Sequence, residues 1–308
     1  MALNLKESRQ NTTTIGKLSN TDIVFTSLCA GACAGALAKT TIAPLDRTKI
    51  NFQISPTKAY STRKALKFLV KTIKTEGVIA LWRGNSATMA RIVPYAAIQF
   101  TAHEQWKRIL AVDPTGTTPG KQFLAGSLAG VTSQSMTYPL DFARARMAVT
   151  HKNDYATLRQ VFLKIYQTEG LITFYRGILP TIMGVIPYAG VSFFTYETLK
   201  RLYKEHVDVN VKTNPLASLG FGAIAGMLGQ TSSYPFDIVR RRMQTDTTKK
   251  YTTISGTLLT IYINEGLIKG LYKGLSMNWI KGPIAVGISF ATYDAIRDFL
   301  RTILTKYR

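Results

Sequence analysis

The stretch Pro44-Leu45-Asp46-Arg47-Thr48-Lys49 (PLDRTK) recurs twice along the chain, as PLDFAR from Pro139 and as PFDIVR from Pro235. The three copies start 95 and 96 residues apart, and each keeps an acid two residues and a base five residues after the proline. Self-similarity at a fixed period is the sequence signature of a repeat architecture. The chain of 308 residues is therefore predicted to form three equivalent units.

Several other features keep the register of these prolines. Before each proline stand two glycines four residues apart, a spacing that lets helix backbones approach closely in lipid. After it come an acid–glycine pair, an aromatic–basic–glycine triplet and a further acid–base pair. The triplets are Trp82-Arg83-Gly84, Tyr175-Arg176-Gly177 and Tyr272-Lys273-Gly274. We expect a short N-terminal segment at 1–21 and repeats at 22–112, 118–206 and 213–304.

The charge balance narrows the class of partner. Lys and Arg number 39 against 17 Asp and Glu, a net charge of +22, which favours nucleic acid, an anionic membrane or an anionic small substrate. Because the basic and aromatic residues follow the repeat, with no spacing typical of RNA-binding or zinc-finger modules, nucleic acid is disfavoured.

Long uncharged runs indicate a membrane protein. Residues 122–140, 177–196 and 213–236 carry no charge, and each is close to the roughly 20 residues that span a bilayer core. Lys281 and Arg91 lie beside other apolar stretches, and such charges should face a water-filled interior. We predict an all-α membrane protein with six transmembrane helices, two per repeat, in which Pro44, Pro139 and Pro235 each kink a helix.

The acid and base after each proline have two interpretations. As neighbours three apart on one helix, they would contribute about 0.2 to 0.5 kcal/mol locally. Under threefold symmetry each acid would instead reach the base of the next helix, which forms a ring. The pairs expected in this first ring are Asp46–Arg144, Asp141–Arg240 and Asp237–Lys49. A second ring would join Glu104, Glu197 and Asp294 to Lys200, Arg297 and Lys107.

With these three signatures in register, the chain resembles the mitochondrial carrier proteins over nearly its whole length. The resemblance implies three pseudo-symmetric repeats, each with a short amphipathic matrix helix, and transport by alternating access. It implies a multi-pass protein of the mitochondrial inner membrane, or alternatively of the peroxisomal membrane, that works as a monomer without cofactor or metal. It also implies cardiolipin at Gly84, Gly177 and Gly274.

In this family the two rings act as gates, the first facing the matrix and the second the cytoplasm. The family braces the first ring with a glutamine nine residues after the proline, which Gln53 and Gln244 match and Ala148 does not. A tyrosine supports the second ring, and Tyr196 and Tyr293 match while His103 does not.

Substrate contacts are expected where the threefold symmetry breaks. Seven residues past the triplets stand Arg91, Gly184 and Lys281, and Lys39 is a further unmatched cation. Two separated cations and a gap suit a ligand with phosphates and a flat body. In the family, a glycine and an aliphatic residue, here Gly184 and Val185, mark carriers of adenine-containing substrates, and Tyr188 matches an aromatic that stacks on adenine.

Within the family, KGLSMNWIKGPIAVGISF from Lys273 resembles carriers of coenzyme A. This implies exchange of coenzyme A, and related adenosine 3′,5′-diphosphate compounds, for adenine nucleotides. The alternative is an ADP/ATP carrier, whose RRRMMM run appears here only as RRRMQT from Arg240. A non-transporting membrane receptor on the same fold and a soluble helical-repeat protein are further alternatives, whereas no constellation of residues suggests an enzyme.

Overall fold

The computed structural model describes residues 19–56, 60–113, 119–150, 154–207 and 215–306. The chain divides into two compact units, one made of Met1–Ile42 with Lys281–Arg308 and the other of Ala43–Ile280. Each unit is described by itself. Most of the N-terminal segment expected at 1–21 lies outside the described residues.

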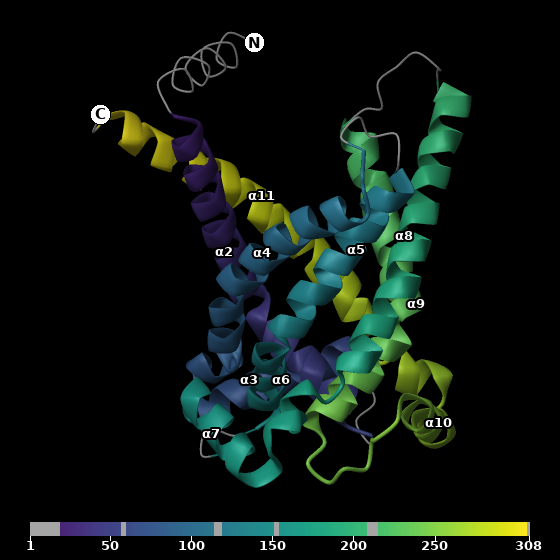
Figure 1. Cartoon of the computed structure of the whole chain (residues 1–308). Coiled ribbons are helices and arrows are strands. Elements are labelled where there is room, and N and C mark those ends of the chain that lie inside the picture. The colour runs from purple at the N-terminus through teal and green to yellow at the C-terminus, as the bar shows by residue number, and fades with distance from the viewer. Residues whose placement is uncertain (1–18, 57–59, 114–118, 151–153, 208–214, 307–308) are drawn as a thin grey trace. The chain divides into compact units, whose positions relative to one another are not determined.

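The described residues form helices and no strands, which confirms the all-α fold class. The helices of the expected membrane-spanning segments are α2 (Asn20–Ile54), α4 (Asn85–Ile109), α5 (Pro119–Met136), α6 (Tyr138–Val149), α8 (Ile178–Val207), α9 (Pro215–Thr245) and α11 (Leu275–Lys306). Within the unit 43–280, α4 packs along α5 and α8 packs along α9 (Figure 1). By length and composition alone, the segments Asp22–Ile54 and Leu171–His206 are apolar enough to cross a membrane.

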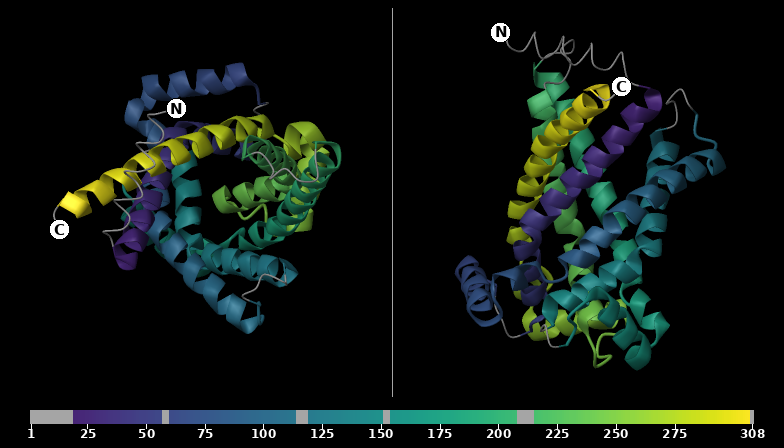
Figure 2. Two further views of the ribbon diagram at one scale, coloured as in Figure 1. Left: turned by 90° about the horizontal axis from the view of Figure 1, so that it is seen from above. Right: turned by 90° about the vertical axis from the view of Figure 1, so that its left-hand side faces the viewer.

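Three short helices occur at equivalent positions of the repeats: α3 (Thr62–Glu76), α7 (Leu158–Glu169) and α10 (Ile254–Glu265). All three lie at the same end of the unit 43–280 (Figures 1 and 2). A glycine with positive φ ends each of them, at 85° for Gly77, 84° for Gly170 and 79° for Gly266. Single turns of tighter or wider helix follow at Val78–Trp82, Leu171–Tyr175 and Leu267–Leu271.

The prediction of a kink inside the helix is wrong for one of the three signature prolines. Pro44 and Pro235 lie inside α2 and α9, as expected. In the second repeat the helix stops at Met136 and a new one begins at Tyr138, so that Pro139 occupies its first turn. Thr137 between them has φ −95° and ψ 5°, outside the α region. Proline suits the first turn because the N–H it lacks would have no partner there.

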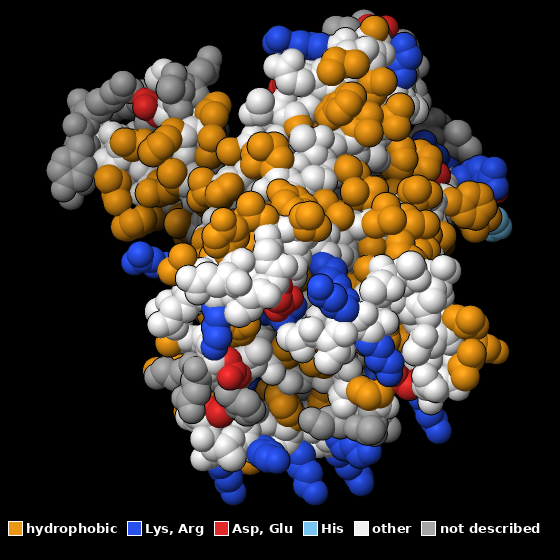
Figure 3. Space-filling model, turned by 60° about the horizontal axis from the view of Figure 1, so that its bottom comes forward, with side chains coloured by type: hydrophobic (Ala, Val, Ile, Leu, Met, Phe, Trp, Pro, Cys, Tyr) orange, Lys and Arg blue, Asp and Glu red, His pale blue; other side chains and the backbone are white. Residues whose placement is uncertain are grey.

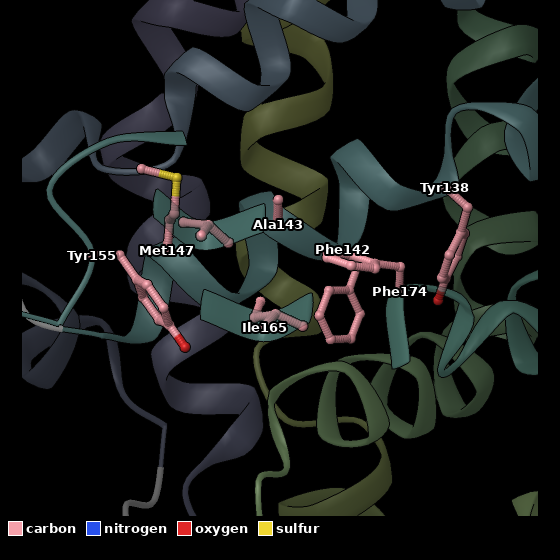
Figure 4. Packing of buried hydrophobic residues seen from close by; sticks show 8 residues of the cluster. Tyr138, Phe142, Ala143, Met147, Tyr155, Ile165 and Phe174 are labelled. Carbon is pink, nitrogen blue, oxygen red and sulfur yellow. The ribbon is translucent and has the colours of Figure 1, made fainter. Parts of the chain in front are cut away.

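Each repeat has a small hydrophobic core at the end where the short helices lie. In the second repeat Tyr138, Phe142 and Met147 of α6 pack with Val161 and Ile165 of α7. Figure 4 shows the rings of Phe142 and Phe174 close together, and their centroids are 5.9 Å apart. An equivalent cluster in the third repeat contains Tyr234, Ile238, Ile261 and Leu271. The helices that carry the signature prolines, α2, α6 and α9, are called the signature helices. Each of them is therefore packed against the short helix of its own repeat.

The surface changes character along the molecule. Figure 3 brings the end with the short helices forward, and Lys and Arg side chains project from it among uncharged ones. Hydrophobic side chains gather farther from this end on the same face. A polar, basic end beside an apolar band is the pattern expected of a protein partly inserted in lipid.

Candidate functional site: a charge ring and its cations

The three interhelical ion pairs of the first ring are all present within the unit 43–280. Lys49 Nζ lies 2.7 Å from Asp237 Oδ2, and Arg240 Nη2 lies 2.5 Å from Asp141 Oδ2. Arg144 Nη2 binds Asp46 Oδ2 in the same way. The carboxylates are largely buried, so that each charge must be matched by its partner to avoid a large desolvation cost.

Glutamines join two of the three pairs. Gln53 Nε2 donates to Asp237 Oδ2 at 3.1 Å and to the hydroxyl of Tyr234 at 3.2 Å. Gln244 Nε2 donates to Asp141 Oδ2 at 3.0 Å and to the hydroxyl of Tyr138 at 2.9 Å. Ala148 stands at the third position, and its side chain cannot donate a hydrogen bond to the Asp46–Arg144 pair.

Arg91 is attached directly to the ring. Its Nη1 lies 3.1 Å from Asp141 Oδ1, its Nη2 donates to Gln134 Oε1 at 2.8 Å, and its Nε donates to Thr137 Oγ1 at 3.3 Å. The guanidinium also lies 4.8 Å from the centre of the Tyr95 ring, close enough for a cation–π interaction. The residue expected to bind substrate thus shares an acid with the ring expected to act as a gate.

A second additional cation, which the sequence reasoning missed, is Arg241. Its Nη1 lies 3.6 Å from Asp141 and its Nε 4.0 Å from Asp237, so it contacts two acids of the ring. The equivalent positions hold Ile50 and Ala145, and this break in symmetry was visible in the sequence. Asp141 consequently lies within ion-pair distance of three arginines.

The second ring has a different arrangement in this structure. Its acids pair with the base three residues along the same helix, at 2.6 Å for Glu104–Lys107, 3.9 Å for Glu197–Lys200 and 2.9 Å for Asp294–Arg297. These acids are about half exposed or more, and α4 and α8 share no ion pair between Glu104 and Lys200. The hydroxyl-bearing ring of Tyr293 lies 5.6 Å from the Arg297 guanidinium, and Tyr196 is half-buried on α8.

The remaining expected substrate residues fall into both units. Gly184, Val185 and Tyr188 lie on α8 in the unit 43–280, where Tyr188 is exposed. A side chain at Gly184 would meet Phe236 Cβ at 3.2 Å, so the glycine also allows α8 to approach α9. Lys39 and Lys281 belong to the other unit, and their expected meeting with Arg91 stays a prediction.

The acid of each acid–glycine pair binds an arginine of a signature helix, a set of links that the sequence reasoning missed. Arg146 Nη2 lies 2.8 Å from Glu169, and Arg242 binds Glu265 in the same way. In the first repeat Asn51 replaces this arginine, and Arg47, one turn earlier, binds Glu76 at 2.9 Å instead. Because residues four apart share a helical face, the substitution preserves the link.

The bases of the triplets connect successive repeats. Arg83 Nε donates to Met147 O at 2.9 Å, Arg176 Nη1 to Asp246 O at 2.8 Å, and Lys273 Nζ to Ser55 O at 2.7 Å. Each contact is with the end of the next signature helix in cyclic order. The triplet glycines have positive φ and lie close to these helices. A side chain at Gly84 would meet the backbone oxygen of Arg144 at 3.0 Å.

Glu265 shows how charge supports this end of the molecule. Burial alone would raise its pKa, but hydrogen bonds from Arg242 and Lys273 outweigh that effect and hold the pKa below its ordinary value. Lys273 Nζ lies 2.9 Å from Glu265 Oε2. The carboxylate is therefore ionised near neutral pH and neutralises two nearly buried cations.

A pseudo-threefold ring of buried ion pairs, joined inside helical repeats to the further cations Arg91 and Arg241, is the arrangement of a solute carrier. The family model described as "Mitochondrial carrier protein" matches residues 21–113, 116–207 and 211–304. The chain belongs to the mitochondrial carrier family, a family of membrane transport proteins, which confirms the resemblance noted in the sequence.

Individual relatives are similar over most of their length. The chain is 55% identical over 284 residues to "Mitochondrial coenzyme A transporter SLC25A42" of Homo sapiens, covering 90% of this chain and 89% of the relative. It is 53% identical over 286 residues to the protein of the same name in Xenopus tropicalis, covering 91% and 87%. "Mitochondrial substrate carrier family protein P" of Dictyostelium discoideum is 39% identical over 286 residues, covering 91% and 95%.

Proposed function

We propose that this carrier exchanges coenzyme A, together with related adenosine 3′,5′-diphosphate compounds, for adenine nucleotides across the mitochondrial inner membrane. The observation that carries the proposal is the attachment of Arg91 to Asp141, because it joins a phosphate-binding cation to the charge ring. The similarity to carriers named for coenzyme A supports the choice of substrate.

The substrate phosphates would bind Arg91 and compete with Asp141 for its guanidinium. Arginine suits this role because its planar donors match phosphate oxygens as well as carboxylate oxygens. Asp141 would retain Arg240 and Arg241 but lose one of its three cations. A ligand shifts an equilibrium only by binding the two states differently, and this exchange of partners provides such a difference.

The other one-off residues would hold the rest of the molecule. Lys39 and Lys281 would bind the separated phosphates, and Gly184 with Val185 would leave a flat space for adenine, which Tyr188 would stack upon. Opening of the first ring towards the matrix would accompany closure of the second, in which Glu104, Glu197 and Asp294 would exchange their local bases for those of the neighbouring helices. We propose that a single chain performs this cycle as a monomer.

Cardiolipin is proposed as a lipid partner at Gly84, Gly177 and Gly274. Each glycine directly precedes a helix, and the N-terminal end of a helix favours a bound phosphate. Beside Gly177 a hollow of about 760 Å³ is lined by Tyr175, Arg176 and Ile178 of that region, and by Phe236 of α9 and Ile254 of α10. Its position next to a helix N-terminus supports a diphosphate headgroup at this place.

The proposed exchange can be tested with purified protein in liposomes that hold ADP or are empty. Labelled coenzyme A and labelled ADP are offered separately from outside. Uptake of coenzyme A that requires internal ADP supports the proposal. Uptake of ADP without uptake of coenzyme A would instead indicate an adenine nucleotide carrier, and uptake of neither would favour a non-transporting receptor.

A further inference from the structure

Arg91 is held by three neighbours, and one of them carries a donor that has no partner. Gln134 Oε1 accepts from Arg91 Nη2 at 2.8 Å. Because a guanidinium has only N–H donors, the oxygen of the amide must face it and the nitrogen must point elsewhere. That nitrogen, Gln134 Nε2, is buried and has no acceptor among the described residues. A buried donor without an acceptor is uncommon in folded proteins and calls for an explanation.

The other two neighbours of Arg91 have no donor to offer to an anion. Asp141 binds Arg91 through a carboxylate, which accepts hydrogen bonds and repels negative charge. The hydroxyl of Thr137 accepts from Arg91 Nε at 3.3 Å and donates its single proton to Ser133 O at 2.8 Å. Of these three groups in the described part of the chain, only Gln134 therefore keeps an unused donor.

The pairing of a glutamine with an arginine breaks the threefold symmetry. Five residues before the signature prolines stand Lys39, Gln134 and Gln230. The residue of α8 that is equivalent to Arg91 is Gly184, so that Gln230 on α9 has no arginine at the matching place. Gln134 and Arg91 thus belong to the asymmetric part of the carrier, where contacts with an asymmetric substrate are expected.

We infer that Gln134 is a further substrate-binding residue, whose Oε1 orients Arg91 and whose Nε2 donates to the phosphate that Arg91 binds. The inference rests on the proposed function, in which a substrate phosphate takes the place of Asp141 on Arg91. A phosphate oxygen accepts hydrogen bonds strongly, and Gln134 would supply one without adding a charge. Gln134 and Arg91 are both half-buried, so neither is closed off from a ligand. Nε2 itself is covered in this structure, and its donor would be used only after Arg91 leaves Asp141.

Two substitutions separate the two roles of the amide. Gln134→Glu keeps an acceptor for Arg91 and removes the donor, whereas Gln134→Lys keeps a donor and removes the acceptor. Gln230→Glu and Gln230→Lys place the same charges at the equivalent position of α9 and serve as matched controls. Coenzyme A uptake by liposomes that hold ADP gives KM and the maximal rate. The rise in unfolding temperature on addition of coenzyme A in detergent reports binding without transport.

We expect Gln134→Glu to raise KM at least about tenfold, the loss that follows removal of a hydrogen bond to a charged group, and to lose the stabilisation by coenzyme A. Gln134→Lys should keep both close to the wild type, because lysine can donate to the phosphate. The two Gln230 variants should differ from each other much less. If Gln134 only orients Arg91, Gln134→Lys will be the more impaired variant, since its charge repels the guanidinium, and this order would overturn the inference. An equal difference between the Gln230 variants would overturn it as well.

Unfolding temperatures without substrate check that each variant is folded. If a charged variant does not fold, Gln134→Met and Gln230→Met replace the pairs: the first should raise KM and the second should not, and equal values would contradict the inference. A wild type that is neither stabilised by coenzyme A nor exchanges it would refute the proposed function, and this inference with it. A wild type that exchanges coenzyme A, beside a Gln134→Glu carrier that does so equally well, would refute the inference alone.

Discussion

The guanidinium of Arg91 on α4 lies 3.1 Å from the carboxylate of Asp141 on α6, so that one acid serves both a substrate cation and a ring pair. Arg91 is 21% exposed whereas Asp141 is only 2% exposed. Arg91 is therefore the more accessible partner of the pair.

Asp141 is predicted to be the acid whose loss destabilises the carrier most. Asp141→Asn would leave Arg91, Arg240 and Arg241 facing a neutral side chain, and an uncompensated buried charge costs about 3 to 5 kcal/mol. Asp237→Asn, where Lys49 and Arg241 are the cations within ion-pair distance, is the matched comparison and should cost less. Thermal unfolding in detergent measures both. Equal shifts for the two variants would show that the extra arginines at Asp141 contribute nothing.

The pair formed by Lys49 and Asp237 should tolerate a reversal of charge better than a single change. Lys49→Asp alone places two acids together, and Asp237→Lys alone places two bases together, so each should reduce both stability and transport. Lys49→Asp/Asp237→Lys restores opposite charges across 2.7 Å. We expect the double variant to recover part of the stability and of the exchange rate. A double variant as poor as the sum of the singles would exclude direct coupling.

Gly84 should be less replaceable than Gly274, which holds the same place in the third repeat, although both have positive φ, at 88° and 82°. An alanine at either position pays the strain of a positive φ, about 1 kcal/mol. At Gly84 the new Cβ would also meet the backbone oxygen of Arg144 at 3.0 Å, whereas at Gly274 the nearest atom is the side-chain oxygen of Tyr234 at 3.4 Å. Gly84→Ala should therefore lower the unfolding temperature more. The opposite order would mean that the contact with α6 is not close in the folded protein.

The contribution of Glu265 should depend on pH. Because its pKa is lower when folded than when unfolded, its stabilisation is complete above the unfolded pKa of about 4.3 and is lost as pH falls through the folded pKa. Glu265→Gln should thus unfold at a lower temperature than the wild type near pH 7, and the gap should narrow below about pH 4.3. Glu205→Gln, at an exposed surface pair, is the control that should show no gap. A gap for Glu265→Gln that stays constant with pH would contradict the account.

The parts of the fold that obey the repeat could be predicted from the sequence. The period of 95 and 96 residues identifies the partners Asp46–Arg144, Asp141–Arg240 and Asp237–Lys49 without any knowledge of distances, because symmetry alone assigns each acid to the next base. The three short helices, α3, α7 and α10, follow from the same register.

The parts that break the repeat required the structure. Whether Arg241 faces the ring or the lipid depends on the rotation of α9, and only the contacts with Asp141 and Asp237 decide it. In the first repeat Asn51 stands where the other repeats have the arginine that binds the acid. That Arg47 binds Glu76 instead depends on how α3 lies against α2. The helix breaks at Thr137, just before Tyr138-Pro139, whereas the same dipeptide, Tyr234-Pro235, lies inside an unbroken helix. The local sequence therefore does not distinguish the broken helix from the unbroken one.

The most direct test of the account is the initial rate of coenzyme A uptake by the Arg91→Ala carrier in liposomes that hold ADP. Arg108→Ala, an exposed arginine in the last turn of the same helix, removes an equal charge away from the ring and serves as the control. The account predicts that Arg91→Ala abolishes exchange while the protein stays folded, and that Arg108→Ala exchanges like the wild type. Retained exchange by folded Arg91→Ala would contradict the claim that this arginine binds the substrate and links it to the ring.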